Sequence, residues 1–289
     1  MPSNKPLHKQ PLAILKASSC SLISHPVILF PFCISAFIQL LVLEILYFAP
    51  RYPLNTIFGL IIERIWGKAY LHYPFNLTLL PKLFQYLQIV IYIFIGSFLI
   101  AMSIAAIIKV NEGKKTRIKT IAKEAFSKYI HIVFAASCMF MFVFLFFKGY
   151  DIIYQRALQI RSTSGKFYLL KQILTTGSPY MYLYFSILAT TLMAYVLPII
   201  MIDQKKVFPA LWINIKTVFS SLWTTFIIVF IPSMLFVPML LIKTSLTKGF
   251  FSPDFALVIM VLSILITLFI DAVIYTSLST RYLLKKENE

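Results

Sequence analysis

Long apolar stretches alternate with short polar connectors along the whole chain. Six stretches consist almost entirely of apolar residues: 26–48, 83–108, 129–147, 180–202, 220–242 and 255–279. A helix needs about 20 such residues to cross the hydrocarbon core of a bilayer. The pattern therefore predicts an all-α fold, a polytopic membrane helix bundle with six transmembrane helices in one domain at residues 26–280.

The connector between the second and third stretches has a different period. From Ile118 to Ile130 its apolar residues follow the i, i+3, i+4, i+7 spacing of one helical face, with lysines off that face. Asn111 and Gly113 predict a turn before it. We expect an amphipathic helix in the headgroup layer, which either only anchors the chain or also binds anionic lipid or a protein partner. Its candidate binding residues are Lys114, Lys115, Arg117, Lys119, Lys123 and Lys128.

Other connectors repeat this pattern more weakly. Residues 1–25 form an expected amphipathic N-terminal segment, and residues 281–289 an expected charged tail. Amphipathic faces also recur within residues 51–82 and at residues 208–222. An interfacial helix, an outward stretch and a returning stretch therefore follow one another three times. This order predicts a three-fold internal repeat, although any array of apolar hairpins shows some similarity of this kind.

Composition and charge narrow the class of protein. Of the 289 residues, 60% are hydrophobic and 13% are charged, whereas a soluble domain has about 25% charged residues. The formal charge of +17 is spread over short connectors beside apolar stretches, which argues against nucleic acid as a partner. The densest basic connector follows the second stretch. The positive-inside rule therefore predicts that both termini lie in the cytoplasm. We expect the protein in the inner membrane of a bacterium.

Two segments resemble a known kind of membrane domain. The segment from Ala17 to Pro31, which contains Ser24, His25 and Pro26, is similar to the start of several bacterial six-span membrane families. The apolar stretch, acidic turn and amphipathic face at residues 197–212 resemble the same proteins. These families include the membrane domain fused to some glycerophosphodiester phosphodiesterases and its stand-alone relatives. The resemblance implies six spans but not that activity, because the chain has no soluble phosphodiesterase domain.

Few residues have the types or spacing that catalysis or metal binding needs. Cys20, Cys33 and Cys138 form no CxxC pair, and the four histidines are scattered. No serine has a neighbouring histidine base, and the sequence contains no glycine-rich phosphate loop. We therefore expect no cofactor, no metal site and no enzymatic activity.

Two acidic residues lie inside the predicted spans, where charged groups are costly. Glu44 is close to the outer surface and is expected to extend toward water or to pair with Arg51. Asp271 lies about 15 Å along a helix from Arg281 and is therefore near the middle of the membrane. It either has a structural role, in which it accepts hydrogen bonds from hydroxyls of a neighbouring span or is protonated within the bundle, or it takes part in coupling to a proton or cation.

These features favour a non-enzymatic scaffold or accessory subunit that binds anionic lipid or a partner protein through basic cytoplasmic helices. The alternative is a transporter or lipid-handling permease in which Asp271 and the fifth span, bent by Pro232 and Pro238, line a path. A structure in which Asp271 faces packed side chains and no cavity would exclude this alternative.

Overall fold

The chain folds into a bundle of membrane-spanning helices. The computed structural model describes residues 10–159, 166–247 and 255–287, and all regular secondary structure in these ranges is helical. Six segments within them have the length and hydropathy to cross a membrane: Pro26–Phe48, Phe75–Asn111, Tyr129–Leu158, Ser178–Ile202, Leu222–Lys243 and Phe255–Glu287. These six segments confirm the prediction of an all-α, multi-pass membrane protein. Helices suit a membrane because they satisfy their main-chain hydrogen bonds internally and apolar side chains cover them.

Three of these segments are longer than the apolar stretches that mark them. The second begins at Phe75 rather than at residue 83. The third continues past the apolar stretch to Leu158, as the helical pattern from Tyr150 to Ile160 predicts. The last segment, α14 (Phe255–Glu287), continues to Glu287, so most of the predicted tail at residues 281–289 is part of this helix. The helical hydrogen-bond ladder does not stop where side chains become polar, which explains why apolarity underestimates helix length.

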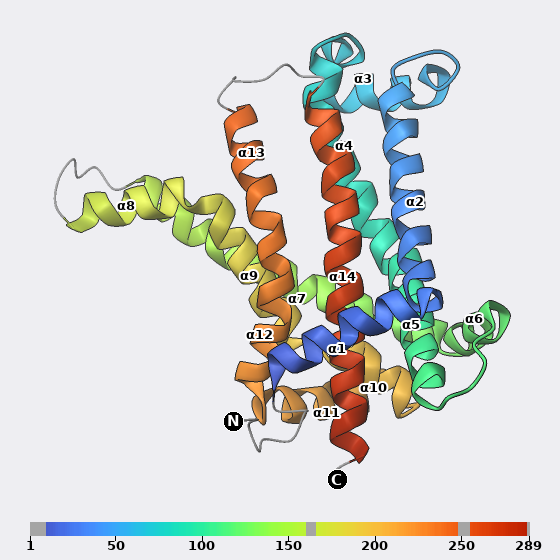
Figure 1. Cartoon of the computed structure of the whole chain (residues 1–289). Helices are drawn as coiled ribbons and strands as arrows, with labels where there is room; N and C mark the ends of the chain where they lie inside the picture. Colours follow the sequence, from blue (N-terminus) through green and yellow to red (C-terminus); the bar gives the residue numbers. More distant parts are fainter. Residues whose placement is uncertain (1–9, 160–165, 248–254, 288–289) are drawn as a thin grey trace.

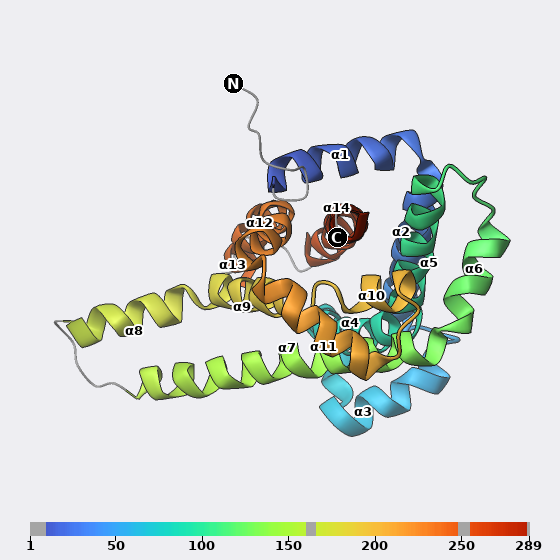
Figure 2. The same cartoon turned by 90° about the horizontal axis from the view of Figure 1, so that it is seen from below.

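The last helix, α14, runs through the middle of the bundle (Figures 1 and 2). It contacts helices that are far apart in the sequence: α1 (Pro11–Ser24), α2 (Pro26–Phe48), α5 (Ser97–Asn111), α10 (Val196–Ile202), α12 (Leu222–Ser233) and α13 (Val237–Thr247). By contrast, α7 (Tyr129–Leu158) and α9 (Ser178–Leu192) extend away from α14 toward α8 (Lys166–Thr176), as Figure 2 shows. Most of the other helices therefore pack around α14.

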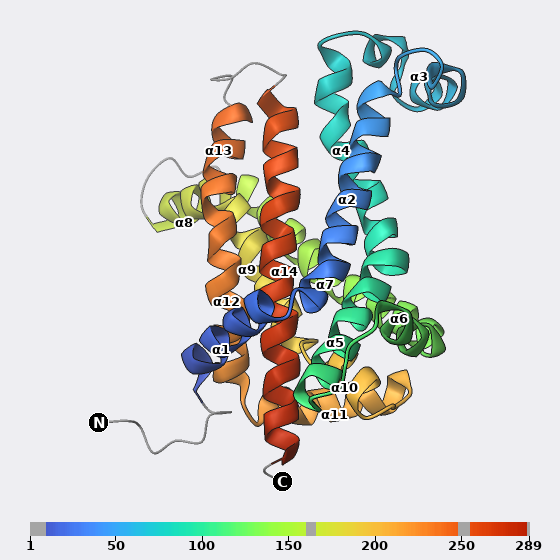
Figure 3. The same cartoon turned by 45° about the vertical axis from the view of Figure 1, so that its right-hand side comes forward.

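Three short helices lie at the end of the bundle where α14 ends, which we call the basic end (Figures 1 and 3). They are α1, α6 (Ile118–Ser127) and α11 (Val207–Phe219). The helix α3 (Leu60–Trp66) lies at the opposite end (Figure 3). Each of the three short helices precedes two spanning segments, which is the order that a three-unit arrangement requires. A common origin of the three units stays a prediction.

Three of the spanning segments are interrupted. The helix α4 (Phe75–Ile91) enters α5 through one π-helical turn, η4 (Tyr92–Gly96). A non-helical turn at residues 193–195 separates α9 from α10, and a 3₁₀ turn, η5 (Met234–Phe236), separates α12 from α13. Within a membrane, such interruptions are tolerated where they face protein or line a cavity.

Candidate functional site

A cavity of about 340 Å³ lies among the spanning segments, beside these interruptions. Helices from all six segments contribute to its wall, which combines apolar side chains with an unusual number of polar groups for the interior of a membrane protein. The polar lining residues are Gln39, Gln88, Tyr92, Ser186, Thr190, Ser233, Thr267, Asp271 and Tyr275. Asp271 lies near the middle of α14 and therefore near the centre of the bundle.

Two of the interruptions supply residues to this wall. Tyr92 is the first residue of η4, and Phe236 is the last residue of η5. None of residues 193–195 lines the cavity, but Thr190, which lies just before this turn, lines it from α9. Single π-helical turns inside α-helices are frequent at functional sites. The cavity that η4 and η5 border is therefore the strongest candidate site.

Two pairs of polar side chains join the helices around the cavity. The Nε2 atom of Gln88 on α4 donates a hydrogen bond to Oε1 of Gln39 on α2, at 2.8 Å. The hydroxyl groups of Tyr92 on η4 and Tyr275 on α14 lie 3.0 Å apart and share a hydrogen bond. These contacts hold three segments of the wall in register and satisfy polar groups that would otherwise be costly in this apolar surrounding.

The polar side chains of the wall differ in whether they form hydrogen bonds within the protein. Ser233 and Thr267 each donate a hydrogen bond to a main-chain carbonyl one turn earlier, at 2.8 Å. Within the described ranges, the side chains of Ser186, Thr190 and Asp271 have no hydrogen-bond partner. The expected hydrogen bonds from hydroxyls of a neighbouring span to Asp271 are therefore absent among the described residues, and the carboxyl group borders the cavity.

The chain matches no model of a known protein family, no curated protein and no solved structure. The resemblance to the membrane domains of glycerophosphodiester phosphodiesterases stays a prediction.

The second acid of the spans, Glu44, is not part of this cavity. It is exposed on α2, in the half of the helix away from the basic end. Arg51, its expected partner, lies over the rings of Tyr47 and Phe48, with its Cζ 5.2 and 5.4 Å from their centroids. No ion pair of Glu44 occurs in the part of the chain that the structure describes. Glu44 therefore has the exposed position that one of the two expectations gave it, without the ion pair.

The predicted basic connector begins at a well-formed helix end. Gly113 has a φ of +66°, the left-handed conformation that glycine adopts most easily. The N–H groups of Gly113 and Lys114 donate to the carbonyls of Val110 and Lys109, at 3.1 and 2.9 Å. These two bonds form a Schellman motif, which ends α5 and turns the chain toward α6. The turn that Asn111 and Gly113 predicted is therefore present.

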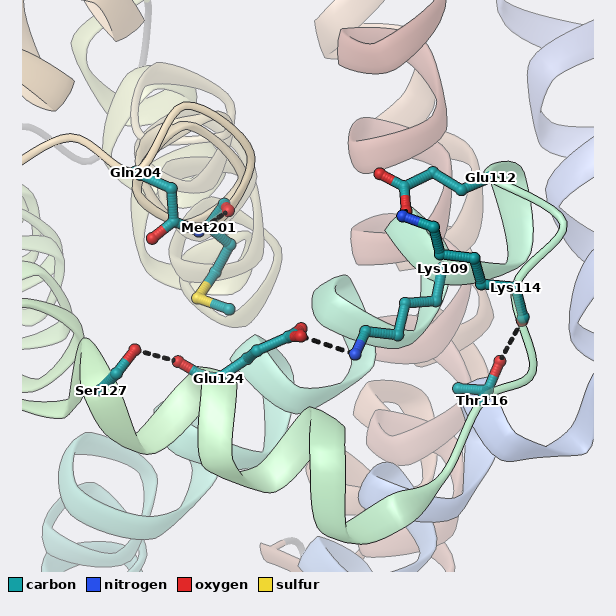
Figure 4. Close-up of polar contacts among 8 residues, drawn as sticks. All are labelled: Lys109, Glu112, Lys114, Thr116, Glu124, Ser127, Met201 and Gln204. Carbon is teal, nitrogen blue, oxygen red and sulfur yellow. Dashed lines mark hydrogen bonds and ion pairs between the residues drawn. The ribbon is translucent and has the colours of Figure 1, made fainter.

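Three of the basic residues around α6 have partners within the chain. Lys109 forms an ion pair with Glu124 at 2.6 Å, which attaches α6 to the end of α5 (Figure 4). Lys114 pairs with Glu112 at 2.7 Å, and the hydrogen bond from its ammonium to that carboxylate raises the pKa of Lys114. Lys128 donates to the main-chain carbonyl of Gln204 at 3.3 Å. Two of the six predicted binding residues are thus engaged in contacts of the fold.

The other four predicted basic residues are exposed. Lys115, Arg117, Lys119 and Lys123 make no ion pair or hydrogen bond with their side chains in the described residues. On the apolar side of α6, Ile121 and Ala125 are buried, whereas Phe126 is 69% exposed. The helix is therefore docked on the bundle by part of its apolar face, and the rest remains available to the bilayer.

Two residues of the cavity wall, and one buried residue outside it, are not among the predicted site residues. Gln39 and Gln88 lie inside predicted apolar stretches, and a polar amide in such a stretch is a signal that would have singled them out. Arg281 was placed in the charged tail, but its side chain is buried. It donates hydrogen bonds to the hydroxyl of Tyr195 and to Oγ1 of Thr225, the latter at 2.7 Å. No local pattern distinguishes such a residue from a basic residue at the membrane surface.

Proposed function

We propose that this multi-pass membrane protein is a non-enzymatic transporter that binds a small polar solute in the cavity around Asp271. The observation that carries the proposal is a carboxyl group that borders a cavity among the spanning segments. Placing an acidic side chain at the centre of a membrane helix costs roughly 2.5–3.5 kcal/mol or more. An acidic residue at such a position is therefore a candidate for a functional role.

The interrupted helices support the same proposal. In many secondary transporters, broken helices meet at a binding site near the middle of the membrane, because their free main-chain groups and local flexibility serve binding and movement. Here η4 and η5 line the cavity, and the turn at residues 193–195 follows the lining residue Thr190 of α9. Bending at these three places would alter access to Asp271 while α14 stays in the centre. In this proposal the basic end faces the cytoplasm of a bacterium.

The first test is a flux measurement with the full chain in liposomes. A mixture of amines, amino acids, sugars and carboxylic acids is loaded, and the loss of each is followed by mass spectrometry. We expect at least one class to leave faster than from empty liposomes, and Asp271→Asn to slow it about tenfold or more.

The matched control is Glu44→Gln, which neutralises an acid outside the cavity and should leave the flux unchanged. Size-exclusion profiles and melting temperatures establish that both variants fold. If no solute leaves faster than from empty liposomes, or a folded Asp271→Asn protein keeps its full flux, the transport proposal is wrong.

The exposed basic residues favour a second candidate function, a scaffold or accessory subunit. Lys115, Arg117, Lys119 and Lys123 extend from the basic end, next to an apolar surface that includes Phe126. Each such residue attracts anionic lipid by about 1 kcal/mol near a membrane surface. These side chains would hold anionic lipid or a partner protein without any solute passing through the bundle.

This candidate is tested by replacing Lys115, Arg117, Lys119 and Lys123 with glutamine. We expect less anionic phospholipid, or less of a partner protein, to be retained when the protein is purified in mild detergent. Both quantities are measured by mass spectrometry. The control replaces the exposed residues Arg64 and Lys82, which lie toward the opposite end of the bundle, with glutamine. Equal retention in the two variants would mean that the connector serves only as an anchor.

A further inference from the structure

We infer that the cavity selects a small organic cation, of the protonated or quaternary amine type, with Asp271 as the counter-ion. The inference rests on the proposed solute-binding function of the cavity and adds the chemical class of the solute. It follows from the charge, the aromatic content and the size of the cavity wall.

The charge of the wall favours a cation. Asp271 is the one acidic residue that lines the cavity, and no Lys, Arg or His of the described residues lines it. A cation beside the ionised carboxylate gives a neutral pair, which stabilises both charges away from water. An anion would be repelled by this carboxylate. A neutral solute would leave the carboxylate without a compensating charge.

The aromatic residues of the wall favour the same class. Tyr92, Phe140 and Tyr275 come from three different elements, η4, α7 and α14. A fourth ring of the wall, Phe236, already has the Nζ of Lys243 at 5.1 Å from its centroid. Aromatic rings attract ammonium groups through their quadrupole, by about 0.5–2 kcal/mol each, and cages of such rings recognise quaternary ammonium groups. The hydroxyls of Ser186 and Thr190, which have no partner among the described residues, are available to accept hydrogen bonds from a protonated amine.

The size of the cavity fits a small organic molecule. Its volume of about 340 Å³ is within the range of roughly 300–1,000 Å³ that small-molecule sites occupy. A zinc site needs His, Cys, Asp or Glu ligands at about 2.0–2.3 Å. The described residues contain no group of three or more such side chains that could hold a metal ion.

The test compares cations with neutral molecules of the same shape. Protein in nanodiscs is titrated by calorimetry with choline and with 3,3-dimethylbutan-1-ol, in which carbon replaces the ammonium nitrogen. 2-Hydroxyethylammonium and propan-1-ol form a smaller pair, and acetate serves as the anion. We expect at least one cation to bind about tenfold or more tightly than its neutral counterpart. Asp271→Asn should abolish this difference, and Glu44→Gln should preserve it.

A second variant covers the case in which Asp271→Asn does not fold. Thr190→Phe adds a large side chain to the wall from α9 and should weaken binding of the cation about tenfold or more without removing the acid. If no cation binds more tightly than its neutral counterpart, the inferred solute class is wrong. In that case, an Asp271-dependent flux of an uncharged or anionic solute in liposomes would leave the transport function standing, whereas no flux of any solute would remove both.

Discussion

Arg281 shows what a single buried side chain does in this bundle. Only 5% of its surface is exposed, and its guanidinium group donates to the Tyr195 hydroxyl and to Thr225. The hydroxyls of Tyr195 and Thr225 also share a hydrogen bond at 3.1 Å. These contacts join α14 to the interruption between α9 and α10 and to α12. A buried guanidinium is stable only when acceptors surround it, so the three residues depend on one another.

We predict that Tyr195→Phe lowers the free energy of unfolding by about 1.5–3 kcal/mol. The change keeps the ring but removes an acceptor of a buried charge, and hydrogen bonds to charged groups contribute this much. Unfolding is followed in detergent with increasing sodium dodecyl sulfate.

The matched control is Tyr184→Phe, because the Tyr184 side chain is 44% exposed and makes no hydrogen bond among the described residues. It should change stability by about 0.5 kcal/mol or less. Equal effects of the two substitutions would contradict the assigned role of Tyr195.

At the scale of elements, the short helix α11 supplies a side chain that stabilises the turn between α9 and α10. Its residue Asn214 is fully buried. The main-chain N–H of Tyr195 donates to Oδ1 of Asn214 at 2.9 Å, and Nδ2 of Asn214 donates to the carbonyl of Leu192 at 2.7 Å. One amide therefore replaces two main-chain partners that a continuous helix would have provided. The interruption is thus a stable part of the fold.

We predict that Asn214→Leu destabilises this region more than the fold around it. Leucine has a similar volume, but it leaves a buried N–H and a buried carbonyl without partners, at a cost of about 1–3 kcal/mol each. Hydrogen exchange measured by mass spectrometry should therefore become faster at residues 192–196. Asn111→Leu is the control, since Asn111 is exposed at the end of α5. Unchanged exchange at residues 192–196 in the Asn214 variant would show that other contacts hold the turn.

At the scale of the whole molecule, the distribution of charge predicts which way the bundle faces. The basic end carries α6 with Lys115, Arg117 and Lys119, as well as the end of α14 with Lys286. Lys286 forms an ion pair with Asp203 at 2.7 Å, and Tyr282 donates to the same carboxylate at 2.5 Å. These contacts hold the end of α14 against the turn after α10, so the basic end is one connected unit.

We predict that the basic end faces the cytoplasm. Lys115→Cys in a chain whose Cys20, Cys33 and Cys138 are replaced by alanine should react with a membrane-impermeant maleimide only after cells are opened. Lys68→Cys, at the opposite end, should react in intact cells, because the Lys68 side chain is 80% exposed. The reverse labelling pattern would invert the orientation and contradict the cytoplasmic location of both termini.

Local patterns were informative where the signal lies in neighbouring residues. The turn at Asn111 and Gly113 and the helical period from Ile118 onward predicted an amphipathic helix after α5, and α6 lies there. Asp271 is recognisable in the sequence because it is an acidic residue within an apolar stretch. This signal does not depend on knowing which residues contact it. The interruptions were harder to predict. Pro232 and Pro238 flank η5, but no proline lies in η4, where the π-helical turn occurs.

The amino-acid sequence alone determined that the chain crosses a membrane in six helices, because apolar length and the need to satisfy main-chain groups leave no other arrangement. Only the tertiary structure decided that Gln39, Gln88 and Tyr92 line the same cavity as Asp271, and that Arg281 is buried. These residues are far apart in the chain, and the hydrophobic effect that defines a span does not specify which faces of the helices meet. Packing between the helices decides which of their faces are in contact, and therefore which polar groups line the cavity.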